Sequence, residues 1–166
     1  GGEFAERRGF ILACRLEDFG KGSIFPHEKT HSKPKEDRFR LFQATGAMFS
    51  QIFALYADPK RLLEETLNPV GDPMFDVEFE GVRNVLWRLT DPIKIDAIAR
   101  YIGKQKIFVA DGHHRYETAL LYRDSRRLKN PAHTGKEAYN FVPMFLTNLH
   151  DPGLVILPTH PLVQSL

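Results

Sequence analysis

The sequence predicts an α+β fold, in which a mixed β-sheet is flanked by helices. Three features of the 166 residues support this: short apolar runs alternate with segments of helical spacing, one hairpin is plain, and no internal repeat or low-complexity run occurs. The length suits a single domain over residues 1–166. Because the chain starts without a Met and its end carries no sign of a natural stop, we expect a fragment of a longer protein.

Strands are expected where apolar residues run together or alternate with polar ones. The first is 8–16, and a short apolar stretch at 24–30 then runs into a polar loop. The remaining strands are 52–56, 106–110, 140–149 and 154–157, with a hairpin of 74–79 and 82–89 that turns at Glu80-Gly81.

Helices are expected where a capping residue or a proline precedes apolar residues at helical spacing. Asp58-Pro59 and Asp91-Pro92 each pair an N-cap residue with a proline at the first helical position. The predicted helices are 34–48, 58–67, 91–103 and 114–128.

The composition narrows the classes of partner. The 23 basic and 21 acidic residues are interspersed and leave a net charge of +2, which argues against a nucleic-acid partner. Cys14 is the one cysteine, so an internal disulfide is excluded, and its apolar run predicts a buried thiol. No stretch reaches the roughly 18 apolar residues of a membrane span, and a cytoplasmic protein is expected.

The segment Asp111-Gly-His-His-Arg115 has the greatest concentration of side chains that could bind a ligand or take part in a reaction. It follows a buried strand and opens a helix, so the first N–H groups of that helix would point into the crevice at the strand ends. Those groups favour an anion, and Gly112 allows a sharp turn and close approach of a ligand. Cationic groups oppose the helix dipole at this position, but His113, His114 and Arg115 would all suit a bound phosphate. Asp111 could hold Mg²⁺ or orient a histidine.

The same residues also have structural interpretations. Asp111 can simply cap the helix, Gly112 can serve only the turn, and His114 can be a packed core histidine. The density of five such residues in a row favours the binding interpretation. A P-loop, a G-x-G-x-x-G motif and a G-x-S-x-G elbow are all missing from the sequence.

A second polar segment, Pro26-His-Glu-Lys-Thr30, leaves a strand end, where site loops often lie. Glu28 could act as a general base or a metal ligand, with His27 as an alternative base, and Lys29 could neutralise a phosphate. The alternative is a solvated loop, followed by charged residues such as Arg38 that solvate a helix start. His27, His113 and His114 could also form a zinc site, although the H-E-x-x-H spacing is absent.

Several runs together closely resemble a widespread prokaryotic family, the domain-of-unknown-function 1015 family. They cover most of the chain in order: 8–11, 22–30, 33–38, 44–45, 51–56, 86–88, 108–119 and 153–160. Members of that family are longer at both ends, which agrees with a fragment.

Asp111-Gly-His-His-Arg115 is also similar to the strand–turn–helix motif of the ParB/sulfiredoxin-like superfamily. That superfamily includes partition proteins that bind CTP, sulfiredoxins that use ATP and free-serine kinases. The resemblance implies a ParB/sulfiredoxin-like fold, nucleotide phosphates bound at Gly112–Arg115, and ATP or another nucleotide with Mg²⁺ as cofactors. By analogy, Glu28 supplies the acidic residue from an earlier segment that assists a metal or the substrate.

Two functions follow from these observations. The first is a nucleotide-dependent phosphotransferase acting on a small hydroxyl-bearing metabolite, with Glu28 as base, Asp111 and Glu28 at the metal, and the basic residues on phosphates. The second is a nucleotide-binding regulatory module without turnover. A domain that binds no ligand is a weaker third interpretation. In the first two cases the partner is a small molecule or nucleotide.

Overall fold

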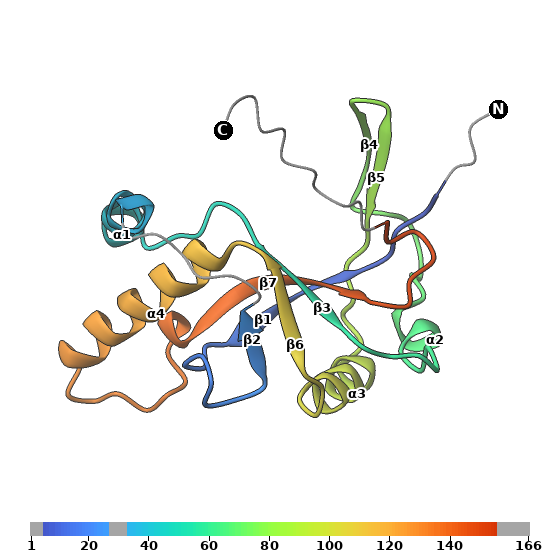
Figure 1. The fold of residues 1–166 in the computed structure, drawn as a ribbon. Helices are drawn as coiled ribbons and strands as arrows, with labels where there is room; N and C mark the ends of the chain where they lie inside the picture. Colours follow the sequence, from blue (N-terminus) through green and yellow to red (C-terminus); the bar gives the residue numbers. More distant parts are fainter. Residues whose placement is uncertain (1–4, 27–32, 156–166) are drawn as a thin grey trace, which may run out of the picture.

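A five-stranded sheet forms the centre of the computed structural model, which describes residues 5–26 and 33–155, the side chains of 33–36 excepted (Figure 1). Its strands lie in the order β1-β7-β3-β6-β2. They are β1 (Phe10–Arg15), β7 (Phe141–Asn148), β3 (Ile52–Tyr56), β6 (Ile107–Asp111) and β2 (Ile24–Pro26). β7 and β3 run parallel, as do β6 and β2, whereas β1 with β7 and β3 with β6 run antiparallel. The predicted mixed sheet is therefore confirmed.

Alternation along the strands separates a buried face from a half-exposed face. Ile52, Ala54 and Tyr56 of β3 are buried, while Phe53 between them is only half-buried. β7 shows the same alternation from Phe141 to Leu146, after which Thr147 and Asn148 are both buried. Apolar side chains of successive strands thus point to the same face, as the two-residue period requires. The sheet presents one core-forming face and one partly open face.

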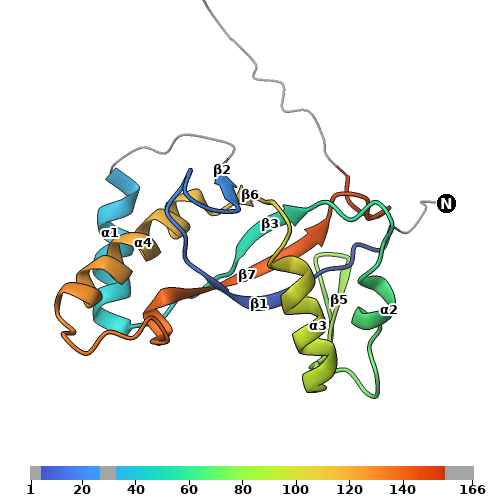
Figure 2. The same ribbon diagram turned by 90° about the horizontal axis from the view of Figure 1, so that it is seen from below.

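Helices cover the core-forming face. In the described residues these are α1 (Lys33–Thr45), α2 (Glu64–Leu67), α3 (Pro92–Ile102) and α4 (His113–Leu128), with a short 3₁₀ turn at Ala138–Asn140. Ile98 and Ile102 of α3 join Tyr116 and Ala119 of α4 in one core with the strands. Figures 1 and 2 show α1 beside α4 at one end of the sheet, and α2 beside α3 at the other. This agrees with the predicted α+β architecture.

Asp91 caps α3 as predicted, because its carboxylate accepts hydrogen bonds from the N–H groups of Ile93 and Lys94, and Pro92 opens the helix.

None of the described helices is long and apolar enough to cross a bilayer. Cys14 is half-buried rather than buried, and desolvation raises the pKa of its thiol to about 11.

The predicted helix over 58–67 is wrong in its first half, since only α2 (Glu64–Leu67) is helical. Arg61 adopts a φ of +54°, which a right-handed helix does not allow. Asp58 is buried instead of capping a first turn. Its N–H donates to Asn148 Oδ1 (2.9 Å), and the Asn148 side chain donates back to its carbonyl (2.8 Å). This contact joins the ends of the parallel strands β3 and β7.

The hairpin forms at the predicted place, with β4 (Phe75–Phe79) and β5 (Val82–Leu86). Glu80 and Gly81 both have positive φ, as a two-residue hairpin turn requires. The hairpin is a separate two-stranded sheet that stands apart from the main sheet in Figure 1. The predicted strand at 154–157 is not found at residues 154 and 155, and its other half lies outside the described residues.

Candidate anion site at the start of helix α4

A bulge and a left-handed glycine set the geometry between β6 and α4. The β3–β6 register shifts so that Phe53 pairs with Asp111 but Ala54 pairs with Val109, which leaves Ala110 as the extra residue. Bulges of this kind bend a strand and re-aim the side chains that follow. Gly112 then takes a φ of +93°, and α4 begins at His113. The chain therefore turns directly from a central strand into a helix.

The helical hydrogen-bond ladder of α4 starts with Tyr116, whose N–H donates to the carbonyl of Gly112 (2.9 Å). The N–H groups of residues 113–115 precede that ladder and carry the positive end of the helix dipole. Tyr116 anchors this first turn in the core. Its hydroxyl donates to the carbonyl of Glu17 (2.8 Å) and accepts from the Glu17 N–H (2.9 Å).

Arg115 folds back over the turn and joins three segments. Its Nη1 donates to Ser50 Oγ (2.7 Å) and to the Gln51 carbonyl (2.6 Å), and its Nη2 donates to Asp111 Oδ2 (2.5 Å). A Cβ on Gly112 would lie only 3.0 Å from Arg115 Nε. The guanidinium is thus held against the backbone of the turn, and its side chain is 19% exposed. Glycine at 112 makes this close approach possible.

Asp111 is the acidic member of the site and is the more open partner of that ion pair, with 70% of its side chain exposed. Mg²⁺ is commonly held by one or two carboxylates together with substrate phosphates and water. A single exposed carboxylate fits that pattern, although a metal at Asp111 would compete with Arg115 for the same oxygens. Among the described residues, no group of three His, Cys, Asp or Glu side chains lies close enough to hold a metal by itself.

The two histidines differ in their surroundings. His113 is buried against the core, with 2% of its surface exposed. His114 is half-buried, and its Nε2 atom has no hydrogen-bond partner within the described part of the chain. A buried imidazole nitrogen without a partner is unfavourable, so His114 retains hydrogen-bonding capacity at the start of α4. The hydroxyl of Thr118 satisfies the His114 carbonyl (2.6 Å).

The second predicted segment, which starts at Pro26, begins beside the strand that leads to Asp111–Arg115. Pro26, at the end of β2, pairs with Val109 of β6, and the two strands run parallel, so both end at the same edge of the sheet. The three residues singled out there, His27, Glu28 and Lys29, lie outside the described residues. Their roles stay predictions.

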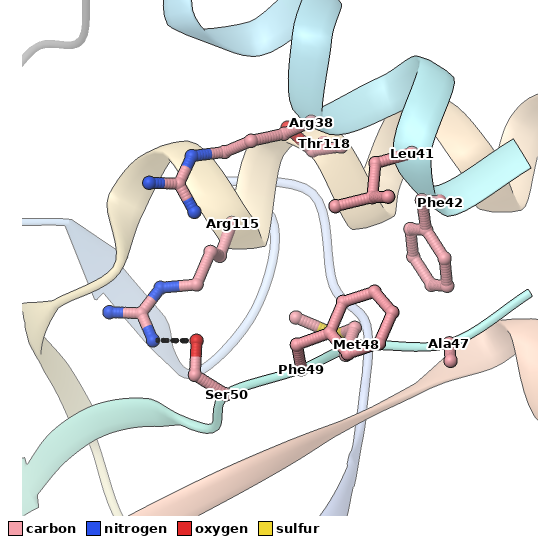
Figure 3. A pocket seen from close by; sticks show the side chains of 9 residues that line it. All are labelled: Arg38, Leu41, Phe42, Ala47, Met48, Phe49, Ser50, Arg115 and Thr118. Atoms are coloured by element: carbon pink, nitrogen blue, oxygen red, sulfur yellow. Dashed lines mark hydrogen bonds between the residues drawn. The ribbon is translucent and has the colours of Figure 1, made fainter. Parts of the chain in front are cut away.

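A small cavity adjoins Arg115 between α1, α4 and the segment that connects α1 to β3 (Figure 3). Its volume is about 110 Å³. Arg38, Phe49 and Ser50, which the sequence did not single out as site residues, line it together with Arg115. Ser50 meets Arg115 across 65 positions of the chain, and no local pattern signals a contact of that range.

Fold and site together define an α+β protein with a mixed sheet and a strand–turn–helix, rich in basic residues, where the inner strand β6 ends. The chain belongs to the family described as "Protein of unknown function (DUF1015)", whose model matches residues 2–166. The predicted resemblance to this family is thereby confirmed. No curated protein and no solved structure matches the chain.

Proposed function

We propose that this protein is a nucleotide-dependent phosphotransferase that acts on a small hydroxyl-bearing metabolite, and that its fold is related to the ParB/sulfiredoxin-like superfamily. The nucleotide would be ATP or another nucleoside phosphate with Mg²⁺. Phosphoryl transfer depends mainly on positioning and on neutralising charge, and the residues at the start of α4 offer both.

The observation that carries the proposal is the position of Arg115. A guanidinium in the first turn of a helix opposes the helix dipole, yet here it is fixed against Gly112 by three hydrogen bonds. A phosphate beside this turn would meet the helix N–H groups, the dipole and the guanidinium together. The arrangement therefore favours an anion over a neutral or cationic ligand.

The remaining roles follow from chemistry and from the place of each residue. His114 would donate to a phosphoryl oxygen, and His113 and Gly112 would contribute through the turn itself. Asp111 would hold Mg²⁺ against the phosphates. Glu28, with His27 as the alternative, would take the proton of the substrate hydroxyl, and Lys29 would neutralise phosphate charge.

The ion pair between Asp111 and Arg115 favours a second candidate, a nucleotide-binding regulatory module without turnover. While Arg115 occupies Asp111 Oδ2, the carboxylate is a poorer metal ligand. A protein with this pair intact would bind an anion without the metal that transfer needs.

The test is to incubate the chain with Mg²⁺, a panel of nucleoside di- and triphosphates and small hydroxy-amino acids, and to follow phosphate transfer by ³¹P NMR. We expect Glu28→Gln and Arg115→Ala to abolish turnover. Arg126→Ala is the control, because Arg126 lies exposed in the last turn of the same helix. Binding without transfer would favour the regulatory module, and a chain that binds no nucleotide would overturn both functions.

A further inference from the structure

The cavity beside Arg115 has an apolar interior and a basic rim. Leu41 and Phe42 of α1 and Met48 of the following segment supply the apolar lining. Phe42 is fixed there because its ring stacks on Tyr122 of α4, with 4.1 Å between ring centroids. The wall is therefore held by packing between the two helices.

Both charged side chains that line the cavity are arginines, Arg38 from α1 and Arg115 from α4, and no acidic side chain is among the lining residues in the described part of the chain. Figure 3 shows the two guanidinium groups extending toward the same side, beyond the apolar lining. Asp111 already pairs with Arg115 beside this rim, so Arg38 is the charge that most favours a ligand that is negative there.

Phe49 is the most exposed of the large apolar side chains in the wall, with 71% of its surface exposed. An aromatic ring left largely in water at the cavity wall offers a stacking face to a planar group. A bare anion would leave the apolar lining solvated, and a wholly apolar ligand would make no use of the arginines, of which Arg115 is already paired with Asp111 (2.5 Å). The two halves of the cavity together fit a ligand with a flat apolar part and an anionic part.

We propose that this cavity receives the base of the nucleotide whose phosphates bind at the start of α4. The inference rests on the proposed function and extends it, because it assigns the base to a pocket formed by α1, residues 47–50 and α4. Phe49 would stack on the base, and Arg38 would lie near the phosphates together with Arg115. Since stacking on Phe is possible for every base, the pocket would favour nucleotides over bare phosphates without strong preference among bases.

The test compares ligands that carry or lack the base. Isothermal titration calorimetry of the chain in the presence of Mg²⁺ would use ATP, CTP, GTP, inorganic triphosphate and adenosine. Phe49→Ala should weaken nucleotide binding by about 5- to 150-fold, the usual effect of losing one base–aromatic stack, and leave triphosphate binding unchanged. Phe79→Ala is the matched control, since Phe79 is 68% exposed on the hairpin, away from the cavity. Arg38→Ala should weaken nucleotides and triphosphate alike, whereas Arg40→Ala, exposed on the same helix but not in the lining, should weaken neither.

The outcomes separate the two proposals. If triphosphate binds as tightly as ATP, or if Phe49→Ala weakens both ligands equally, the base pocket is wrong while the phosphate site stands. If neither ATP nor triphosphate binds to the unaltered chain, the proposed function fails and the base pocket fails with it. Circular dichroism of each variant checks that the substitution leaves the fold intact.

Discussion

Gly112 combines two constraints that set it apart from the other described glycines. Its φ of +93° disfavours any side chain, and a Cβ there would lie 3.0 to 3.1 Å from three atoms of the Arg115 guanidinium. Other glycines with positive φ, such as Gly20 and Gly46, have open space around the same position. Only at Gly112 does a backbone requirement coincide with the geometry of the candidate site.

This difference predicts the outcome of alanine substitution. Gly20→Ala should cost about 1–2 kcal/mol, the usual cost of a left-handed conformation for a residue with a Cβ. Gly112→Ala should cost more, because Arg115 must also shift from Ser50 and Gln51, and it should weaken triphosphate binding. Urea denaturation and calorimetry measure the two effects. Equal losses of stability in both variants, with binding intact, would contradict the role given to Gly112.

Helix starts and turns that depend on adjacent residues are found where the sequence predicts them. The Asp91-Pro92 start of α3 and the Glu80-Gly81 turn lie at the expected positions, because capping and positive φ depend on adjacent residues. The helix predicted from Asp58 does not form in its first half, because Asn148, 90 positions away, binds that segment instead. The candidate site shows the same difference between local and long-range contacts. Asp111–Arg115 could be identified as one short run, whereas Ser50 and Arg38 join it only through packing of α1 and the β3 end on α4.

The loop from α4 to β7 is organised around Glu137. Its carboxylate accepts hydrogen bonds from the N–H (2.7 Å) and hydroxyl (2.7 Å) of Thr134, the N–H of Gly135 (3.0 Å) and the side chain of Asn140 (3.1 Å). Hydrogen bonding from the Thr134 backbone is the largest cause that lowers the pKa of Glu137 from 4.5 to about 2, and His133 adds to it. The ionised form is therefore the one that holds the loop.

The sign of this shift fixes a pH dependence. Because the pKa is lower in the folded state, Glu137 stabilises the protein above pH 4.5, and that contribution is lost as the pH falls from 4.5 toward about 2. Urea midpoints measured across this range should fall less steeply in Glu137→Gln than in the unaltered chain. Glu78→Gln, on the exposed strand β4, serves as control. An identical slope for Glu137→Gln and the unaltered chain would show that the carboxylate does not hold the loop.

The hairpin and the main sheet differ in what packs against them. The main sheet packs its buried face on α3 and α4. On the hairpin, the cross-strand pairs Phe75–Leu86 and Phe79–Val82 lie on one face, and all four side chains are at least 42% exposed. The opposite face carries an ion pair between Arg83 and Asp76 (2.6 Å). A two-stranded hairpin with both faces exposed is only marginally stable in water.

Hydrogen–deuterium exchange should therefore reveal two classes of backbone amides. Amides of β3 and β7 should exchange through global unfolding, whereas those of β4 and β5 should exchange through local opening, orders of magnitude faster. Mass spectrometry of peptides covering 52–56 and 75–86 reads both classes in one experiment. Slow exchange of the hairpin would instead mean that its apolar face is covered in solution.

The antiparallel pairing of β3 with β6 places Tyr56 opposite Ile107. The whole excursion between them, α2, the hairpin and α3, thus leaves and re-enters the sheet at neighbouring points. Arg115 lies near the opposite end of β3, beside Gln51. The excursion therefore departs from the end of β3 that lies away from the α4 turn, while Ile98 and Ile102 of α3 return to the shared core. For protein engineering, the Glu80-Gly81 turn is accordingly the place to graft a reporter domain while keeping clear of the candidate site.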